Sequence, residues 1–186
     1  MSESKRASSQ TKVLAEIIVF AALSAVLYVF RPFSMPYGGS VTLGSMVPVL
    51  WLSLRRGVYP GLVAGAIFGI IALPIDVALL PYSPIATPLQ AVLEYPIAFA
   101  VLGLAGIFHK KPVTFAIAGV AISVFVKFLI HYFVGVFIWY YIYEFPAFGQ
   151  YLYPAIYNGL FLIPEFIISV IVITILVKKG ILEYAL

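Results

Sequence analysis

A glutamate, a tyrosine and a proline stand together in the middle of a long apolar run, as Glu94, Tyr95 and Pro96. A carboxylate in hydrocarbon costs about 2.5–3.5 kcal/mol on insertion scales, so a functional site is the first interpretation of Glu94. The proline cannot donate a backbone hydrogen bond and clashes one turn back, which predicts a kink and a free carbonyl near Val92. The alternative is a protonated carboxyl, or one paired to a neighbouring helix for packing.

Four residues at intervals of four form a second polar feature, Lys127, His131, Gly135 and Trp139. On a helix this spacing puts a cation, an imidazole, a gap and an indole on one slowly drifting face. We expect Lys127 to extend toward the cytoplasmic interface, and Gly135 to leave room for a flat ligand. The alternatives are an interfacial aromatic belt for Trp139 and an interhelical hydrogen bond for His131.

Tyrosines and an asparagine gather near the start of the last apolar run. Pro154 suits the first turn of a helix, which places Tyr153 at the outer mouth, with Tyr157 and Asn158 one turn deeper. Asn158 offers both a hydrogen-bond donor and an acceptor, as an aminopyrimidine edge requires. Residues 139–143 add further aromatic side chains to the same rim.

The elements that position these residues must be membrane helices. The chain has 186 residues, of which 63% are hydrophobic and 10% are charged, whereas a soluble domain has about 25% charged residues. The composition predicts an all-α integral membrane protein, with residues 1–186 as a single transmembrane domain and residues 1–12 as a polar cytoplasmic N-terminus. Cysteine is absent, which excludes disulfides and thiolate metal sites.

Hydropathy predicts six membrane-spanning runs at about 13–31, 41–54, 58–80, 84–108, 113–142 and 153–177. The second run is short and contains Pro48, so we expect it to be tilted, broken or shielded by protein. Six crossings put nine of the eleven basic residues on one side: Lys5, Arg6, Lys12, Arg55, Arg56, Lys110, Lys111, Lys178 and Lys179. The positive-inside rule then makes both termini cytoplasmic and puts Asp76 and Glu144 outside. The net charge of +4 therefore reflects helix orientation, and no nucleic-acid partner is expected.

Small residues predict close helix packing in two runs. The third run has Gly57, Gly61, Gly65 and Gly69 at strict four-residue spacing, which favours packing inside the protein over a partner interface. The first run contains several alanines that could pack internally or dock another membrane protein. Glu16 and Glu165 also lie in apolar runs, and either could pair with Lys127.

The predicted depths of the polar residues agree. In the six-helix topology, Glu94, the stretch from His131 to Trp139, and the pair Tyr153 and Asn158 all lie in the outer halves of their runs. They could line a pocket open to the outside that takes a flat, cationic, heteroaromatic ligand. No metal-ligand spacing is present, and no cofactor is expected.

These segments together resemble the thiamine-specific substrate-binding (S) component of energy-coupling factor (ECF) transporters. The resemblance extends over essentially the whole chain and rests on residues 53–57, 90–95 and 127–139, with Tyr153 and Asn158. It implies the S-component fold in a prokaryotic cell membrane, thiamine as ligand, and membrane lipid as surroundings. It also implies docking on a transmembrane coupling subunit that carries two cytoplasmic ATPases.

The resemblance also assigns residues. The ligand-binding positions of the family are matched by Glu94, Tyr95, His131, Trp139, Tyr153 and Asn158. Positions close to the ligand are matched by Lys127 and Gly135. Tyr82 matches a further ligand-side tyrosine across a loop of different length. The sequence departs from the family at the small-residue pair of the first helix, where Ile18 and Ala22 stand and the nearest true pair is Ala21 and Ala25. A covering loop tryptophan is replaced around Gly38 and Gly39, which leaves Tyr37 as a candidate lid.

Three other functions remain open at this point. One is an S component for another vitamin or a nucleobase. Another is a small intramembrane enzyme that uses His131 and Glu94 as an acid–base pair, although the sequence offers no nucleophile or metal beside them. The last is a structural membrane partner without a ligand. The chain has no Gly-x-x-x-x-Gly-Lys-Ser/Thr loop, so we expect no ATP hydrolysis by the chain itself.

Overall fold

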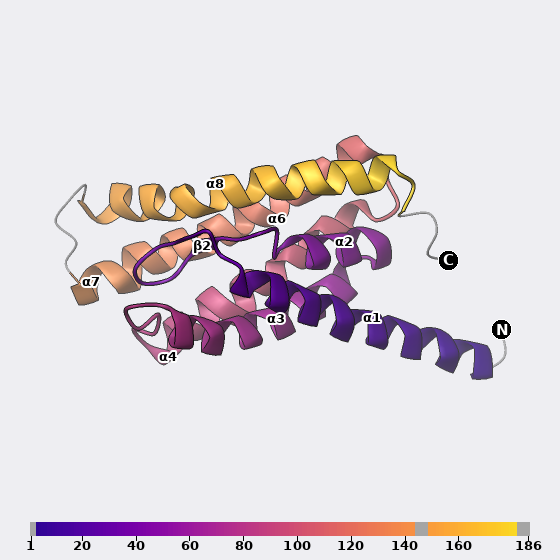
Figure 1. Cartoon of the computed structure of the whole chain (residues 1–186), viewed down its shortest axis with the longest axis horizontal. Coiled ribbons are helices and arrows are strands. Elements are labelled where there is room, and N and C mark those ends of the chain that lie inside the picture. The colour runs from indigo at the N-terminus through magenta and orange to yellow at the C-terminus, as the bar shows by residue number, and fades with distance from the viewer. Residues whose placement is uncertain (1–2, 144–148, 182–186) are drawn as a thin grey trace.

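The computed structural model describes residues 3–143 and 149–181, and these form a helical bundle (Figure 1). Its elements in chain order are α1 (Glu3–Val29), β1 (Phe33–Ser34), β2 (Ser40–Val41), α2 (Val47–Arg56), α3 (Val58–Leu79), α4 (Pro88–Val92), the π-helix η1 (Leu93–Ile97), α5 (Ala98–Ala100), the 3-10 helix η2 (Val101–Phe108), α6 (Val113–Val134), the π-helix η3 (Gly135–Trp139), α7 (Tyr140–Tyr143) and α8 (Gly149–Lys178). The start of α1 and the end of α8 lie at the same end of the bundle (Figure 1). Glu144 lies outside the described residues.

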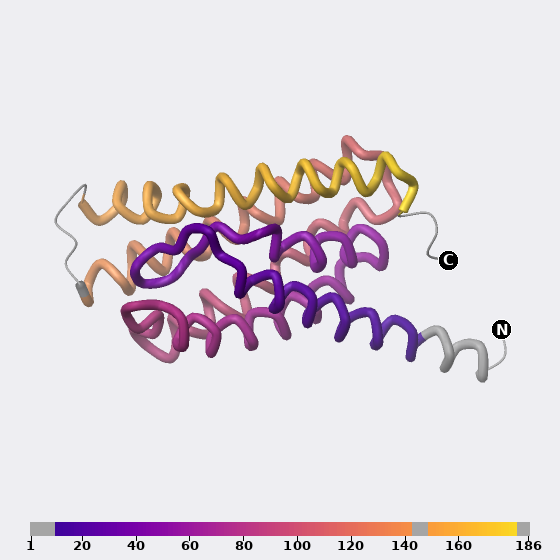
Figure 2. Tube along the Cα trace, viewed as in Figure 1, coloured from indigo at the N-terminus to yellow at the C-terminus, as the bar shows by residue number. Residues whose placement is uncertain are grey.

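These elements join into six helical rods, because α4 to η2 run continuously, as do α6 to α7. The prediction of an all-α bundle is confirmed. The two strands have only two residues each and pair antiparallel, with Phe33 opposite Val41 and Ser34 opposite Ser40. Figure 2 follows the chain from α1 through this small hairpin into α2.

The second predicted run differs from the structure. Helix α2 has only 10 residues, about 15 Å of length, against a hydrocarbon core of about 30 Å. Residues 41–46, which hydropathy placed in the same run, form the end of the hairpin and turns. The expected shielding by protein is confirmed, because every residue from Val47 to Leu54 is buried. Among the described residues, five helices are long and apolar enough to cross a membrane by themselves.

Pro96, where we predicted a kink, lies inside a π-helix, η1. A proline nitrogen has no hydrogen to donate, so the backbone rewinds locally instead of continuing the α pattern. A second π-helix, η3, begins at Gly135. Both π-helices contain predicted site residues, Glu94 and Tyr95 on η1 and Gly135 and Trp139 on η3. The rewound segments therefore determine which way these side chains point.

The glycines of α3 pack inside the protein, as predicted. A Cβ atom on Gly65 would overlap the carbonyl oxygen of Phe99, and one on Gly69 would overlap that of Tyr95. A Cβ atom on Gly61 would meet the backbone of Gly103 at 2.8 Å. Helix α3 therefore lies directly against the rod from η1 to η2. Gly57 ends α2 with a φ of 92° and belongs to the same contact, because a Cβ atom on Gly106 of η2 would overlap the backbone of Gly57.

The first helix presents two different faces. Ala21 and Ala25 are buried inside the bundle, so the nearest small-residue pair packs internally. Ile18 and Ala22 are exposed on the outer surface of α1. The positions that match the docking pair of the related family are therefore the ones that face outward.

Glu16 pairs with the basic residues at the end of α2 and not with Lys127. Its carboxylate accepts hydrogen bonds from Arg56 Nε at 2.7 Å and from the terminal guanidinium nitrogens of Arg56 and Arg55 at 2.8 and 3.2 Å. These contacts join α1 to α2 at the end of the bundle where α8 finishes.

We predict that Gly65→Ala destabilises the bundle by about 1–3 kcal/mol, because the added methyl group forces α3 away from Phe99. The measurement is thermal unfolding of the purified protein in detergent. Gly159→Ala in α8 is the matched control, since its Cβ atom meets nothing closer than 3.7 Å. Equal melting temperatures for the two variants would contradict the packing described here.

Candidate ligand-binding site

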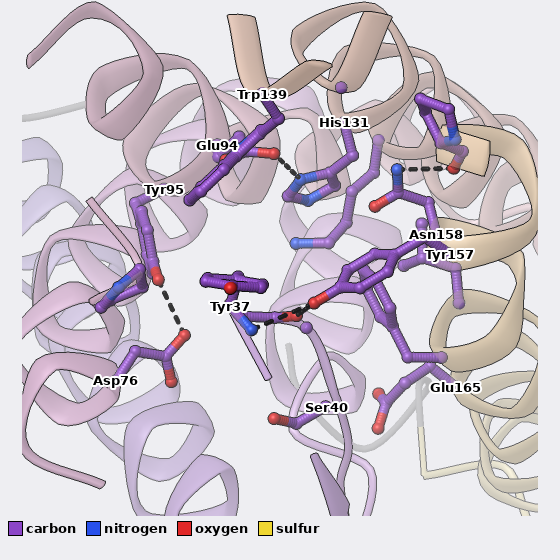
Figure 3. A pocket seen from close by; sticks show the side chains of 18 of the residues that line it. Tyr37, Ser40, Asp76, Glu94, Tyr95, His131, Trp139, Tyr157, Asn158 and Glu165 are labelled. Carbon is purple, nitrogen blue, oxygen red and sulfur yellow. Dashed lines mark hydrogen bonds and ion pairs between the residues drawn. The ribbon is translucent and has the colours of Figure 1, made fainter. Parts of the chain in front are cut away.

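A cavity opens between the helices (Figure 3). Its lining includes Tyr28 near the end of α1 and Asp76 near the end of α3, so it lies in the half of the bundle away from the start of α1 (Figure 1). Its charged and polar lining comes from α1, the loop between α1 and α2, α3, η1, the rod of α6 and η3, and α8. The lining residues that carry the argument are Tyr37, Asp76, Glu94, Tyr95, Lys127, His131, Gly135, Trp139, Tyr153, Asn158 and Glu165. All the sequence-predicted site residues except Tyr82 thus meet at one cavity.

Glu94 is held by donors from its own rod and from the rod of α6 and η3. Its Oε2 accepts from Trp139 Nε1 at 2.8 Å and from Gln90 Nε2. Its Oε1 lies 3.2 Å from His131 Nδ1. Figure 3 shows His131 and Trp139 converging on the carboxylate from above the cavity. The expected agreement in depth among these three residues is confirmed.

Gln90 supports this arrangement from one turn before Glu94. It is fully buried, and its amide also bonds the carbonyl of Pro84 at 3.1 Å and the backbone N–H of Ala86 at 3.0 Å. The glutamine therefore ties the loop before α4 to the carboxylate. Its four-residue spacing from Glu94 was the sequence signal for this contact.

Asp76 is a cavity residue that the sequence analysis placed only on the outer side. Helix α3 continues to Leu79, and the Asp76 side chain is 1% exposed. Its Oδ2 accepts from Tyr95 Oη at 2.8 Å and from Tyr28 Oη at 2.9 Å. Its Oδ1 accepts from an Arg31 terminal nitrogen at 2.6 Å. Arg31 thus neutralises a buried carboxylate from 45 residues away in sequence.

Lys127 does not reach the cytoplasmic interface, so that expectation is wrong. Helix α6 begins at Val113, which places Lys127 about four turns inside it, beyond the reach of its side chain. It is 3% exposed and lines the cavity, with Nζ 3.2 Å from the ring centroid of Phe99. A cation over an aromatic face gains electrostatic stabilisation. Nζ has no hydrogen-bond partner among the described residues.

Gly135 does not leave a gap for a ligand, which corrects a second expectation. A Cβ atom there would meet Pro154 Cβ at 2.6 Å, so Pro154 of α8 already fills the space beside the glycine. The small residue allows α8 to approach η3 closely. The missing side chain at Gly135 therefore serves helix packing, although Gly135 also borders the cavity.

Helix α8 contributes Asn158 and Tyr153 to the cavity. Asn158 is 6% exposed and donates from Nδ2 to the Pro154 carbonyl at 2.9 Å. Figure 3 shows its side-chain oxygen on the cavity side, where it can accept a hydrogen bond. The Tyr153 ring lies 5.7 Å from that of Tyr157.

The loop between α1 and α2 covers the cavity with Tyr37. Its ring lies 5.9 Å from the ring of Trp139 and is stacked on Tyr82 at 5.1 Å. Tyr157 holds this loop, because its Oη accepts from the Tyr37 backbone N–H at 3.2 Å and donates to the Gly38 carbonyl at 3.1 Å. Tyr82 is 56% exposed and does not line the cavity, so it supports Tyr37 from outside.

Glu165 holds the other end of the same loop. Its Oε1 accepts from the hydroxyl of Thr42 at 2.7 Å and also from the Thr42 backbone N–H. The direct partner of Glu165 is therefore Thr42 and not Lys127. Its second oxygen, Oε2, is buried without a hydrogen-bond partner among the described residues. Among residues 3–143 and 149–181, no three His, Asp or Glu side chains are placed to hold a metal ion.

Comparison with known proteins identifies the family. The model of the thiamine transporter protein family matches residues 14–183. The chain belongs to this family. It is 32% identical over 142 residues to the thiamine transporter ThiT of Lacticaseibacillus paracasei, which covers 70% of this chain and 69% of that protein. It is 29% identical over 182 residues to ThiT of Bacillus subtilis, which covers 91% and 92%.

A solved structure of ThiT from Listeria monocytogenes has the same fold, with a TM-score of 0.77 and 27% sequence identity. The match covers 92% of this chain and 96% of that chain. These comparisons make the chain a multi-pass membrane protein of a bacterial transporter family. They concern the chain as a whole, and the ligand-binding roles of single residues stay predictions.

We predict that Tyr157→Phe speeds hydrogen exchange at the backbone amide of Tyr37, because that amide loses its acceptor. The measurement is hydrogen–deuterium exchange mass spectrometry on the peptides that cover residues 35–41. Tyr151→Phe is the matched control, since Tyr151 is 66% exposed. Unchanged exchange in Tyr157→Phe would show that the hydroxyl does not hold the loop.

Proposed function

We propose that this chain is the membrane subunit that captures thiamine from outside the cell for uptake. The observation that carries the proposal is Glu94, a carboxylate held at the wall of the cavity by Gln90, His131 and Trp139. These donors orient the carboxylate. Its negative charge remains available to a cationic ligand.

The formal charges around the cavity support a ligand with a single positive charge. Arg31 offsets Asp76 through a direct ion pair. Lys127 and Glu165 line the same cavity with opposite charges. With His131 as a neutral imidazole, the charge of Glu94 is left over, and the thiazolium ring of thiamine carries the one positive charge that balances it.

The uncharged groups suit a flat ring with polar edges. Trp139 and Tyr37 offer aromatic faces, which attract a cationic heterocycle. Asn158 presents an acceptor. His131 Nε2 and Lys127 Nζ are buried and have no hydrogen-bond partner among the described residues. An aminopyrimidine edge can both donate to and accept from such groups.

We further propose that the energy for transport comes from partner proteins. The sequence lacks a phosphate-binding loop for ATP. The family resemblance implies an ECF transmembrane coupling subunit with two cytoplasmic ATPases. The outward-facing surface of α1 around Ile18 and Ala22 is the candidate contact with that subunit.

We predict that Glu94→Gln lowers the affinity for thiamine by at least about tenfold, because the amide cannot balance the thiazolium charge. Isothermal titration calorimetry on protein purified without thiamine measures this. A neutral isostere, with thiophene in place of the thiazolium ring, should bind wild type and Glu94→Gln with similar affinity. Glu16→Gln makes the same chemical change outside the cavity and should leave thiamine affinity unchanged.

Two outcomes would contradict the proposal. If wild-type protein binds another vitamin or nucleobase but not thiamine, the chain serves a different ligand. If Glu94→Gln lowers the affinity for thiamine and for the neutral isostere equally, Glu94 acts through the shape of the cavity and not through its charge.

A further inference from the structure

Asp76 joins three helical rods at the wall of the cavity. It belongs to α3 and receives hydrogen bonds from Tyr28 in the last turn of α1, from Arg31 just after that helix, and from Tyr95 on η1. Figure 3 shows its carboxylate directed at the hydroxyl of Tyr95. Neither the family resemblance nor the charge balance proposed for the ligand gives Asp76 a part in binding.

The ion pair makes Asp76 an acceptor. The side chains of Arg31 and Asp76 are 8% and 1% exposed and approach to 2.6 Å. A carboxylate paired in this way has no hydrogen to donate. Each oxygen takes hydrogens from its neighbours, and Oδ2 takes those of both tyrosines.

The acceptor role of Asp76 determines how Tyr95, which lines the cavity, can bond a ligand. A tyrosine hydroxyl has one hydrogen, and that of Tyr95 is used by Asp76 at 2.8 Å. The lone pairs that remain on Tyr95 Oη can only accept. A ligand atom at this point must therefore bring its own hydrogen.

We propose that Asp76 is a positioning residue that fixes Tyr95 as a hydrogen-bond acceptor and so selects a ligand with an N–H or O–H group at that point. The proposal rests on thiamine binding in this cavity. Thiamine has two such groups, the amino group of its pyrimidine and the hydroxyl of its side chain. Asp76 acts through Tyr95 and need not touch the ligand.

The test replaces both members of the ion pair, because a single change would leave one buried charge unpaired. The side-chain amide that Arg31→Gln/Asp76→Asn introduces can offer Tyr95 a hydrogen as well as accept one, so the hydroxyl is no longer fixed. We expect thiamine affinity to fall about tenfold in this variant. In a Tyr95→Phe background, the same pair of changes should cause no further loss, as a double-mutant cycle by calorimetry will show.

The affinities for two thiamine analogues show whether Asp76 acts on the ligand through Tyr95, because a purely structural role would affect both analogues alike. One lacks the amino group and the other lacks the side-chain hydroxyl. We expect the cost of Arg31→Gln/Asp76→Asn to vanish for one analogue, the one that lacks the group donating to Tyr95, and to persist for the other. If the cost persists for both analogues, or adds fully to that of Tyr95→Phe, the proposal is wrong.

Should the double variant not fold, Tyr95→Phe tests with the same ligands whether Tyr95 accepts a hydrogen from thiamine, which the inference requires. This variant should have a lower affinity for thiamine and for one analogue, and an unchanged affinity for the other analogue. Equal losses of affinity for both analogues would overturn the inference. Failure of wild-type protein to bind thiamine would instead refute the proposed function. The two failures are therefore distinguishable.

Discussion

A negative charge inside an apolar bundle is tolerated only where donors surround it, and Glu94 sets this requirement for the whole outer half of the protein. Its partners come from one turn earlier on the same rod and from His131 and Trp139 on another. The hydrogen bonds between Glu94 and these partners fix the rotation of the two rods relative to each other. The π-helices η1 and η3 lie where that rotation is adjusted, and each contains one side of the contact.

Much of this arrangement could be predicted from the sequence because it depends on local spacing. Four-residue intervals put His131 and Trp139 on one face, and charge asymmetry placed them at the same depth as Glu94. The glycines of α3 indicated close packing for the same reason. In each case the pattern repeats within one helix, so no knowledge of distant partners was required.

What could not be predicted depends on partners far away in the chain. Hydropathy cannot distinguish a membrane span from a short buried helix, so α2 was expected to be longer than it is. The burial of Asp76 needs Arg31, and the filling of the space beside Gly135 needs Pro154. Lys127 is a different case, because the predicted run begins at 113 as α6 does, and a position about four turns inside it already lies too deep for the side chain to reach the interface.

The shortness of α2 has an electrical consequence. Its fully buried leucines, Leu50 and Leu52, lie at one end of the bundle, and the cavity occupies the other. In the proposed orientation, water and salt reach the cavity, so the voltage across the membrane drops mainly over the thin apolar layer around α2. A unit charge that crosses the whole voltage changes in energy by about 2.3 kcal/mol per 100 mV. A cation entering the cavity would gain part of that energy, so an inside-negative potential would draw it inward.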